Sequence, residues 1–180
     1  LQSQGIEVLG SDTKEKFFTD EVLKKLKIEV IEGFNKENIP IDADLIIASA
    51  AYLGQGVKNS EVKEAKKKNI SLLTYSQILG ILFQKKYGIA VAGTHGKTTT
   101  TSLVASVMAE GGLDPTFVIG GRLASADAHA RLGAGKYLVA EADESDASFM
   151  HLQPMISVVT NIDVDHLATY QNDFQQLKRT

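Results

Sequence analysis

The chain has 180 residues and no cysteine. Without thiols it has neither a disulfide framework nor a thiolate metal site, and redox chemistry through sulfur is excluded. This absence fits a reducing compartment, and we expect a cytoplasmic protein. Long apolar runs are lacking as well: the longest, residues 45–53, contains Ser49 and is much shorter than the ~20 residues that a membrane-spanning helix needs. We therefore expect no insertion into a membrane.

An excess of positive charge is also absent, because the formal net charge is -3 at pH 7. A nucleic-acid-binding domain usually carries a basic face, so no nucleic acid partner is expected. The lysine run Lys66-Lys67-Lys68 is interpreted as the solvated end of a helix. The sequence shows no internal repeat and no low-complexity segment, and it gives no indication of an oligomeric state.

Short apolar runs alternate with segments of helical periodicity along the whole chain. This alternation predicts an α/β fold with two parallel-sheet modules, residues 1–86 and residues 87–180. The predicted strands are 6–9, 45–48, 70–73, 88–92, 117–119, 137–140 and 156–159, and the predicted helices are 60–68, 76–85, 97–110 and one from about 173. Between residues 24 and 33 the pattern predicts a short passage from helix to strand.

The first module has an acidic residue at the end of its first strand, in Gly10-Ser11-Asp12. In a doubly wound fold, such a residue follows a glycine-rich first turn by about twenty residues. That turn would precede Leu1, so we expect the module to be incomplete at its start and the native chain to extend beyond both ends.

The second module contains a phosphate-binding loop. Gly93-Thr94-His95-Gly96-Lys97-Thr98-Thr99 lies between a predicted strand and a predicted helix. The common phosphate loop has a glycine where this chain has Val91, so this is a shorter form. Small residues let the backbone surround phosphate oxygens, the lysine reaches the terminal phosphates, and the Thr98 hydroxyl can ligate magnesium. The simpler alternative is a glycine turn with a solvated lysine.

The helix after this loop is expected to bury one apolar face, made of Leu103, Val104, Val107 and Met108.

Four carboxylates follow the strand at 137–140, in the segment 141–146. Ligands of parallel sheets bind beyond the carboxyl ends of the strands. This segment, the phosphate loop, and the strand ends Gly120-Gly121 and Thr160-Asn161 should therefore line one crevice. Magnesium prefers such oxygen ligands, and Glu141, taken as the first residue after the strand, is best placed to reach the ion. Asp143, Glu144 and Asp146 could equally cap helices or bond loop backbone, and capping is favoured for Asp146.

Histidines form the weakest group of candidates. His166 follows the strand at 156–159 and could ligate a second metal or orient a phosphate, with Asp165 holding its ring. A lone histidine more often has no such role. His95 lies in the loop, and its simpler interpretation is packing within the loop. His129 and Arg131 lie in a polar segment, and their simpler interpretation is a solvated surface.

Taken together, these stretches resemble the Mur ligase family. The resemblance is carried by residues 93–101, 114–121, 129–133, 140–154, 160–162, 165–166 and 169–171. It is dense from 88 to 174 and looser before 86. In that first part 10–12 and 49–51 match the family's uridine-nucleotide domain, whereas Thr74-Tyr75 stand where two arginines are common.

The resemblance implies both a fold and an activity. The fold would be a Rossmann-like N-terminal domain for a UDP-sugar, incomplete at its start, followed by part of a P-loop ATPase central domain. The activity would be ATP- and Mg²⁺-dependent ligation of L-alanine to UDP-N-acetylmuramate through an acyl phosphate, in peptidoglycan precursor synthesis. The family's third domain is not represented in this chain, so the chain alone is expected to be inactive.

The resemblance also implies roles for individual residues. Lys97, Glu141 and His166 would be catalytic; Gly93, Thr94, His95, Gly96, Lys97, Thr98 and Thr99 would bind ATP; Thr98, Glu141 and His166 would bind magnesium; and Ser11, Asp12, Ser49, His129 and Arg131 would face the UDP-sugar.

Three alternatives remain open. The family member that recycles murein peptides shares the loop with His95, although Ser145 in place of a tyrosine and the run 151–154 favour the L-alanine reaction. A simple phosphate-loop ATPase or kinase would need the same loop but has no use for the first module. A non-enzymatic nucleotide-binding module is the third.

Overall fold

A computed structural model describes residues 1–2, 5–15, 17–53, 58–123, 128–143, 148–165 and 167–179. The chain divides into two compact units, Leu1–Tyr75 and Ser76–Thr180. The sequence places the domain boundary at residue 86, so the two divisions differ only over helix α3 (Tyr75–Gln84), and the predicted boundary stays a prediction. Within the described ranges, no helix combines the length and the apolar character needed to cross a membrane.

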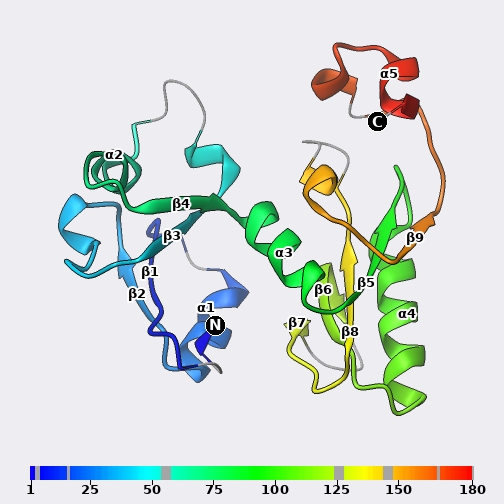
Figure 1. The fold of residues 1–180 in the computed structure, drawn as a ribbon, viewed down its shortest axis with the longest axis horizontal. Coiled ribbons are helices and arrows are strands. Elements are labelled where there is room, and N and C mark those ends of the chain that lie inside the picture. The colour runs from blue at the N-terminus through cyan, green and yellow to red at the C-terminus, as the bar shows by residue number, and fades with distance from the viewer. Residues whose placement is uncertain are drawn as a thin grey trace. The chain divides into compact units, whose positions relative to one another are not determined.

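The first unit contains two pairs of parallel strands (Figure 1). Strand β1 pairs with β2, with Leu9 opposite Glu29, and β3 pairs with β4, with Leu45 opposite Ser71. Parallel pairing requires a crossover, which helices supply. The elements are β1 (Leu9–Asp12), α1 (Phe18–Lys25), β2 (Glu29–Glu32), η2 (Lys36–Asn38), β3 (Leu45–Ala48), η3 (Ala50–Tyr52), α2 (Ser60–Lys67) and β4 (Ser71–Thr74).

One prediction for this unit was wrong. The strand expected at 6–9 lies at Leu9–Asp12, because pairing with β2 extends the ladder through residues that look like a turn. The predicted passage from helix to strand between residues 24 and 33 is present: α1 covers Phe18–Lys25, Lys27 leaves the helical region with a φ of 55°, and β2 covers Glu29–Glu32.

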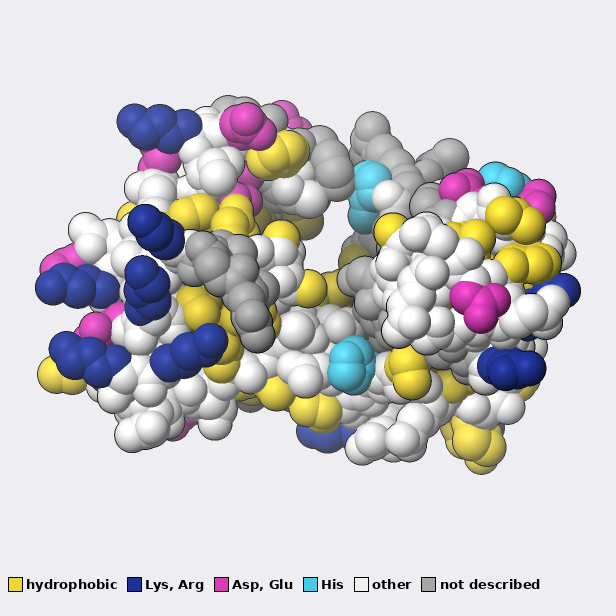
Figure 2. Space-filling model, turned by 90° about the horizontal axis from the view of Figure 1, so that it is seen from above, with side chains coloured by type: hydrophobic (Ala, Val, Ile, Leu, Met, Phe, Trp, Pro, Cys, Tyr) yellow, Lys and Arg dark blue, Asp and Glu magenta, His cyan; other side chains and the backbone are white. Residues whose placement is uncertain are grey.

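The lysine run behaves as predicted. Helix α2 ends at Lys67, and the ammonium groups of Lys67 and Lys68 lie 3.9 and 3.8 Å from the carboxylate of Glu64. On the face drawn in Figure 2, lysine and arginine side chains stand among acidic and apolar ones.

The second unit is built on a five-stranded sheet in the order β7-β6-β8-β5-β9. All neighbours are parallel except β6 and β7, which are antiparallel. The strands are β5 (Tyr87–Ala92), β6 (Thr116–Leu123), β7 (Ala128–Arg131), β8 (Tyr137–Glu141) and β9 (Ile156–Val159). Strand β7 was not predicted, because its sequence, Ala-His-Ala-Arg, alternates only small alanines with polar residues and has no β-branched or aromatic side chain.

Helices cover both faces of this sheet (Figure 1). Adjacent residues of β5 and β8 point to opposite faces, as the period of two requires. On one face Leu79 and Phe83 of α3 pack with Ala90, Leu138 and Ala140. On the other, Ala105 of α4 packs with a second set, Ile89, Phe117, Ile119 and Val139. Burial on both faces explains why these strands read as continuous apolar runs. The remaining elements are α4 (Lys97–Glu110), η4 (Ser148–His151), η5 (Leu167–Tyr170) and α5 (Phe174–Arg179).

Helix α4 has the predicted bounds, but only two of the four residues predicted for its buried face, Val104 and Met108, pack on the core. Thr101 and Ala105 are buried, with Val104 and Met108 partly buried beside them, whereas Leu103 and Val107 are 60% and 69% exposed. The buried positions follow the i, i+3, i+4, i+7 spacing of one helical face. The small side chains at 101 and 105 let the helix approach the sheet closely.

Candidate functional site

The phosphate loop connects the carboxyl end of β5 to the start of α4. Gly96 caps α4 with a left-handed φ of 81°, and Gly93 has a φ of 130°. A Cβ on Gly93 would lie 2.2 Å from Oγ1 of Thr160, so glycine is required there on two grounds. The first N–H groups of α4 have no carbonyl within the helix to bond, which makes this helix start suitable for an anion.

The lysine of the loop is folded back over it. Nζ of Lys97 donates to the carbonyl oxygen of Gly93 at 2.7 Å and lies 3.5 Å from that of Thr94. The ammonium group therefore sits on the loop itself.

Thr98 and Glu141 come together from two elements. Oγ1 of Thr98, on the first turn of α4, donates to Oε2 of Glu141 at 3.3 Å, and the N–H of Gly120 donates to Oε1 at 2.9 Å. Glu141 is the last residue of β8 rather than the first after it, and this position brings it beside α4. A hydroxyl and a carboxylate are thus in contact at the start of α4, and Lys97 precedes Thr98 in the chain.

These two oxygen donors fit magnesium. Mg²⁺ usually takes one or two protein ligands and completes its shell with water and substrate phosphates. Among the described residues no group of three or more histidines or carboxylates could hold a metal. The described part of the chain therefore suits an ion shared with a phosphate group rather than an ion caged by protein.

Thr160 and Asn161 contact the loop from the end of β9. The sequence predicts only that these strand-end residues lie near the loop, and the structure shows how they hold it. Asn161 exchanges two hydrogen bonds with the backbone of His95, and Thr160 donates to the carbonyl of His95 at 2.6 Å.

Part of the predicted site lies outside the described residues. This applies to His166, proposed as the second metal ligand, and to Glu144, Ser145 and Asp146 of the acidic segment. Asp143 is described and exposed, and its carbonyl accepts a bond from the N–H of Phe149 at 3.2 Å.

The first unit has its candidate residues at the end of β1. Oγ of Ser11 donates to Oε2 of Glu61 at 2.5 Å, and Oδ1 of Asp12 accepts from the N–H of Thr13 at 2.7 Å. Ser49 lies in another place, as the N-cap of η3, where its hydroxyl accepts from the N–H of Ala51 at 3.4 Å. Glu61 is a residue that sequence reasoning missed.

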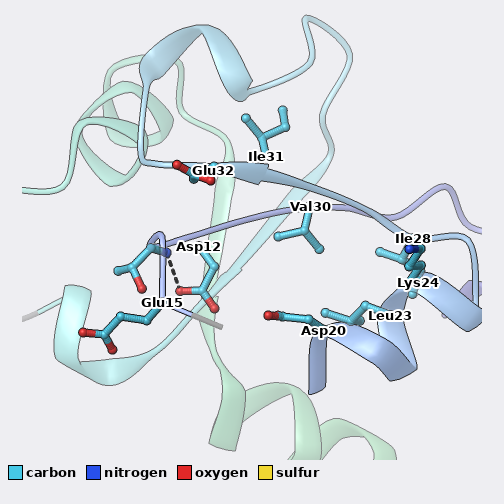
Figure 3. Close-up of a pocket in the computed structure, with 10 residues that line it drawn as sticks. Asp12, Glu15, Asp20, Leu23, Lys24, Ile28, Val30, Ile31 and Glu32 are labelled. Carbon is cyan, nitrogen blue, oxygen red and sulfur yellow. Dashed lines mark hydrogen bonds between the residues drawn. The ribbon is translucent and has the colours of Figure 1, made fainter. Parts of the chain in front are cut away.

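Beside Asp12 is a pocket of about 280 Å³ (Figure 3). Carboxylates reach it from separate elements: Asp12 from β1, Asp20 from α1 and Glu32 from β2. Glu15, from the segment of the chain that joins β1 to α1, adds a fourth. Its remaining lining is Thr13, Leu23, Lys24, Ile28, Val30 and Ile31. An acidic lining disfavours a phosphate and suits an uncharged group that donates hydrogen bonds.

His129 and Arg131 lie on β7. The guanidinium of Arg131 is paired with the carboxylate of Asp114 and lies 5.9 Å from the ring centre of Phe117. Arg131 is opposite Phe117 near the start of β6, whereas the phosphate loop follows the end of β5. The parallel strands therefore put Arg131 toward the other end of the sheet from the loop. His129 is two residues nearer to the β6 end at Leu123.

The carboxylate of Asp114 is held by several donors. The N–H of Ala134 donates to Oδ2 at 2.7 Å, and this bond, with the hydrogen bond and charge of Arg131, lowers the pKa of Asp114 below its ordinary value. Gly133 and Gly135 pack so closely on this turn that a Cβ would lie 2.2 and 1.9 Å from backbone oxygens. The contacts of Arg131 are thus those of a structural turn.

Comparison with known proteins now identifies the family. Residues 1–87 match the model of the Mur ligase family, catalytic domain, and residues 91–178 match that of the Mur ligase middle domain. The chain belongs to the Mur ligase family. The two models meet close to the boundary that the sequence predicts at residue 86.

Solved structures agree with this assignment. The chain is similar to UDP-N-acetylmuramate:L-alanyl-gamma-D-glutamyl-meso-diaminopimelate ligase from Neisseria meningitides, at 30% identity and a TM-score of 0.82, covering 99% of this chain and 61% of that one. It is similar to UDP-N-acetylmuramate-alanine ligase from Thermotoga maritima, at 30% identity and a TM-score of 0.85, with 99% and 41% coverage. A murein peptide ligase from Psychrobacter arcticus follows at 27% identity and a TM-score of 0.80, with 98% and 42% coverage. The chain thus spans only part of the length of each.

Proposed function

We propose that this chain is the nucleotide-binding part of an ATP-dependent ligase that acts on UDP-N-acetylmuramate in peptidoglycan synthesis in the cytoplasm. The contact between Thr98 and Glu141, beside Lys97, is the observation that carries the proposal. An ammonium group and two oxygen donors lie at one helix start, and this supports a role for Lys97 at the terminal phosphates and for Thr98 and Glu141 at magnesium. A glycine turn with a solvated lysine would not need a carboxylate on the neighbouring strand.

The proposed reaction has two steps. A carboxylate oxygen of the muramate attacks the γ-phosphorus of ATP, and ADP leaves. The amine of the second substrate then attacks the carbonyl carbon of the acyl phosphate, loses a proton, and phosphate leaves. The protein contributes mainly positioning and neutralisation of charge.

Each residue of the loop has a part in this scheme. Lys97 would turn from the carbonyl of Gly93 to the β- and γ-phosphates, while the α4 N–H groups hold phosphate oxygens. Thr98 and Glu141 would hold Mg²⁺, which when bound neutralises charge on the transferred phosphoryl group. His166 remains our proposed ligand for a second ion.

The pocket beside Asp12 is the proposed place for the uridine end of the UDP-sugar. Its carboxylates would accept hydrogen bonds from an imide N–H or ribose hydroxyls, and its apolar wall, with Val30, would contact a ring. Ser11 would take part through its hydroxyl. Ser49, His129 and Arg131 also remain proposed contacts of this substrate, although the present partners of Arg131 would have to be released.

For the second substrate we propose L-alanine. The tripeptide L-alanyl-gamma-D-glutamyl-meso-diaminopimelate is a second candidate, because the similarity to the Neisseria ligase is as high as that to the Thermotoga enzyme, 30% in both cases.

The decisive experiment extends the chain from its gene to the whole protein and measures phosphate release with ATP, Mg²⁺ and UDP-N-acetylmuramate. L-alanine, glycine, L-serine and the tripeptide are added separately. Release that depends on L-alanine supports the proposal, and release that depends on the tripeptide alone selects the second candidate. Phosphate release that is indifferent to every one of these substrates would identify a simple ATPase instead.

A further inference from the structure

Asn161 bonds the backbone of the phosphate loop in both directions. The N–H of His95 donates to Oδ1 of Asn161 at 3.0 Å, and Nδ2 of Asn161 donates to the carbonyl oxygen of His95 at 2.7 Å. The side-chain amide of asparagine has an acceptor oxygen and a donor nitrogen side by side. It can therefore bond both the N–H and the carbonyl of one residue, as the backbone of a neighbouring strand does. Aspartate has no donor, and glutamine is one carbon longer.

Further hydrogen bonds join the same two segments, the phosphate loop and the residues after β9. The N–H of Thr94 donates to the carbonyl of Asn161 at 3.2 Å, and the N–H of Asp163 donates to Oγ1 of Thr94 at 2.9 Å. Oγ1 of Thr160 adds its bond to His95 at 2.6 Å, and Gly93 approaches Thr160 too closely for a Cβ. Residues 93–95 therefore lie directly against residues 160–163.

This arrangement fixes which way the loop faces. The N–H and the carbonyl of His95 belong to the two peptide groups that flank its Cα, and both bond to Asn161. Neither peptide group can rotate away while these bonds hold. Gly96, which comes next, has a left-handed φ of 81° and starts α4. The path of the chain into the start of α4 is thus set by His95, and the position of His95 depends on Asn161.

We infer that Asn161 is a positioning residue of the nucleotide site: it holds the backbone on both sides of the His95 Cα so that the start of α4 and Lys97 face the phosphates. The inference rests on the proposed nucleotide binding, and it assigns Asn161 no contact with the nucleotide. Asn161 is exposed, so its two bonds compete with water, and their pairing on one residue is what makes them effective.

The test compares Asn161→Ala with the parent chain and with Gln175→Ala, which removes an exposed side-chain amide on α5 of the same unit. Nuclear magnetic resonance gives amide hydrogen exchange without nucleotide, and then chemical shifts during titration with Mg²⁺-ATP. We expect the His95 amide of Asn161→Ala to exchange about tenfold faster and the dissociation constant for Mg²⁺-ATP to rise about tenfold. Gln175→Ala should match the parent in both.

The two readouts separate the possible failures. Unchanged exchange at His95 with weakened binding would show that Asn161 contacts the nucleotide directly and overturn the positioning role. Faster exchange with unchanged binding would also overturn it, because the loop would then not need Asn161. If the parent chain shows no shifts with Mg²⁺-ATP, the proposed nucleotide site fails, and this inference fails with it.

Discussion

The hydroxyl of Thr98 lies 3.3 Å from Oε2 of Glu141 and joins the first turn of α4 to the end of β8. The two residues are 43 positions apart in the sequence and meet because β5 and β8 are neighbouring parallel strands. Parallel strands bring their carboxyl ends to one edge of the sheet, so a residue that ends β8 faces the loop that ends β5.

The first prediction concerns magnesium. In the whole enzyme, Glu141→Ala and Glu141→Gln should each raise the Mg²⁺ concentration for half-maximal activity at least about tenfold, because both remove the carboxylate charge. Thr98→Ser keeps the hydroxyl and serves as the matched control, with little change expected. The measurement is initial rate against Mg²⁺ concentration at saturating ATP. Equal magnesium curves for Glu141→Gln and the parent would remove Glu141 from the metal site.

Lys97 carries the second prediction. Lys97→Ala should lower the rate of ligation by about 10² to 10³, the usual effect of removing one preorganised charge contact, roughly 3 kcal/mol. Lys85→Ala is the control, because Lys85 is an exposed lysine at the end of the preceding helix. Phosphate release by the whole enzyme is the assay. Normal ligation by Lys97→Ala would contradict the assignment of this loop to ATP.

The two glycines of the loop allow a third, internally controlled prediction. Gly96→Ala meets nothing within 4 Å, so it should cost only the left-handed penalty of roughly 1–2 kcal/mol. Gly93→Ala adds contacts of 2.2 Å with Thr160 and 2.8 Å with the carbonyl of Asn161, and overpacking of this kind typically costs a further ~1–3 kcal/mol. Urea denaturation of the chain measures both. A Gly93→Ala variant as stable as Gly96→Ala would mean that residues 160–161 do not support the loop.

Much of the second unit follows from the sequence alone. The bounds of α4 and β9 are those predicted, because a helix between glycines and a short run of apolar, mostly β-branched residues have clear local signals. Burial of Thr101 in place of Leu103 could not be foreseen, since the distance between helix and sheet selects for small side chains there. Strand β7 exists through its pairing with β6 and has no local apolar signal.

The site shows the same division. The proximity of the loop, Thr98 and Glu141 was predictable because each lies at or just after the end of a recognisable strand. Asn161 was placed near the loop for the same reason, but its bonds to His95, 66 positions away, were not foreseen, and Glu61, bonded to Ser11 50 positions away, was missed. A polar residue at a strand end or a helix start is a weak signal until its partner is known.

Glu61 gives the fourth prediction. Its Oε1 accepts from Nδ2 of Asn38 at 2.8 Å and from the N–H of Asn35 at 3.2 Å, while Oε2 accepts from Ser11. Glu61→Ala leaves these donors unpaired and should lower the free energy of unfolding of the first unit by about 1–3 kcal/mol.

Glu64→Ala, one turn further along α2, is the matched control for Glu61. It removes only surface ion pairs with Lys67 and Lys68, and should cost less than about 1 kcal/mol. Amide exchange of β1 and β2 residues reports on the first unit separately from the second. Equal amide exchange in the two variants would show that Glu61 does not connect β1 to residues 35–38, which follow β2.

The last prediction uses the pH dependence of stability. Because the folded-state pKa of Asp114 is lowered, first by the N–H of Ala134 and also by Arg131, its contribution to stability is present above the ordinary carboxyl pKa of about 4. That contribution is lost as the pH falls through the lowered pKa. Asp114→Asn removes the titration and still tolerates the φ of 39° at this position, since asparagine adopts left-handed backbone readily.

Urea denaturation of the chain at pH values from about 3 to 6 compares the parent with Asp114→Asn. The variant should be less stable near pH 6 and should lose less stability on acidification, so the two curves converge at low pH. Arg131→Ala should behave in the same direction because it removes one of the two donors. A purely structural arginine would change the stability of the turn and leave KM for UDP-N-acetylmuramate in the whole enzyme as it was. If Arg131→Ala instead leaves the pH profile of stability unchanged and raises that KM, the ion pair with Asp114 is dispensable and Arg131 serves the substrate.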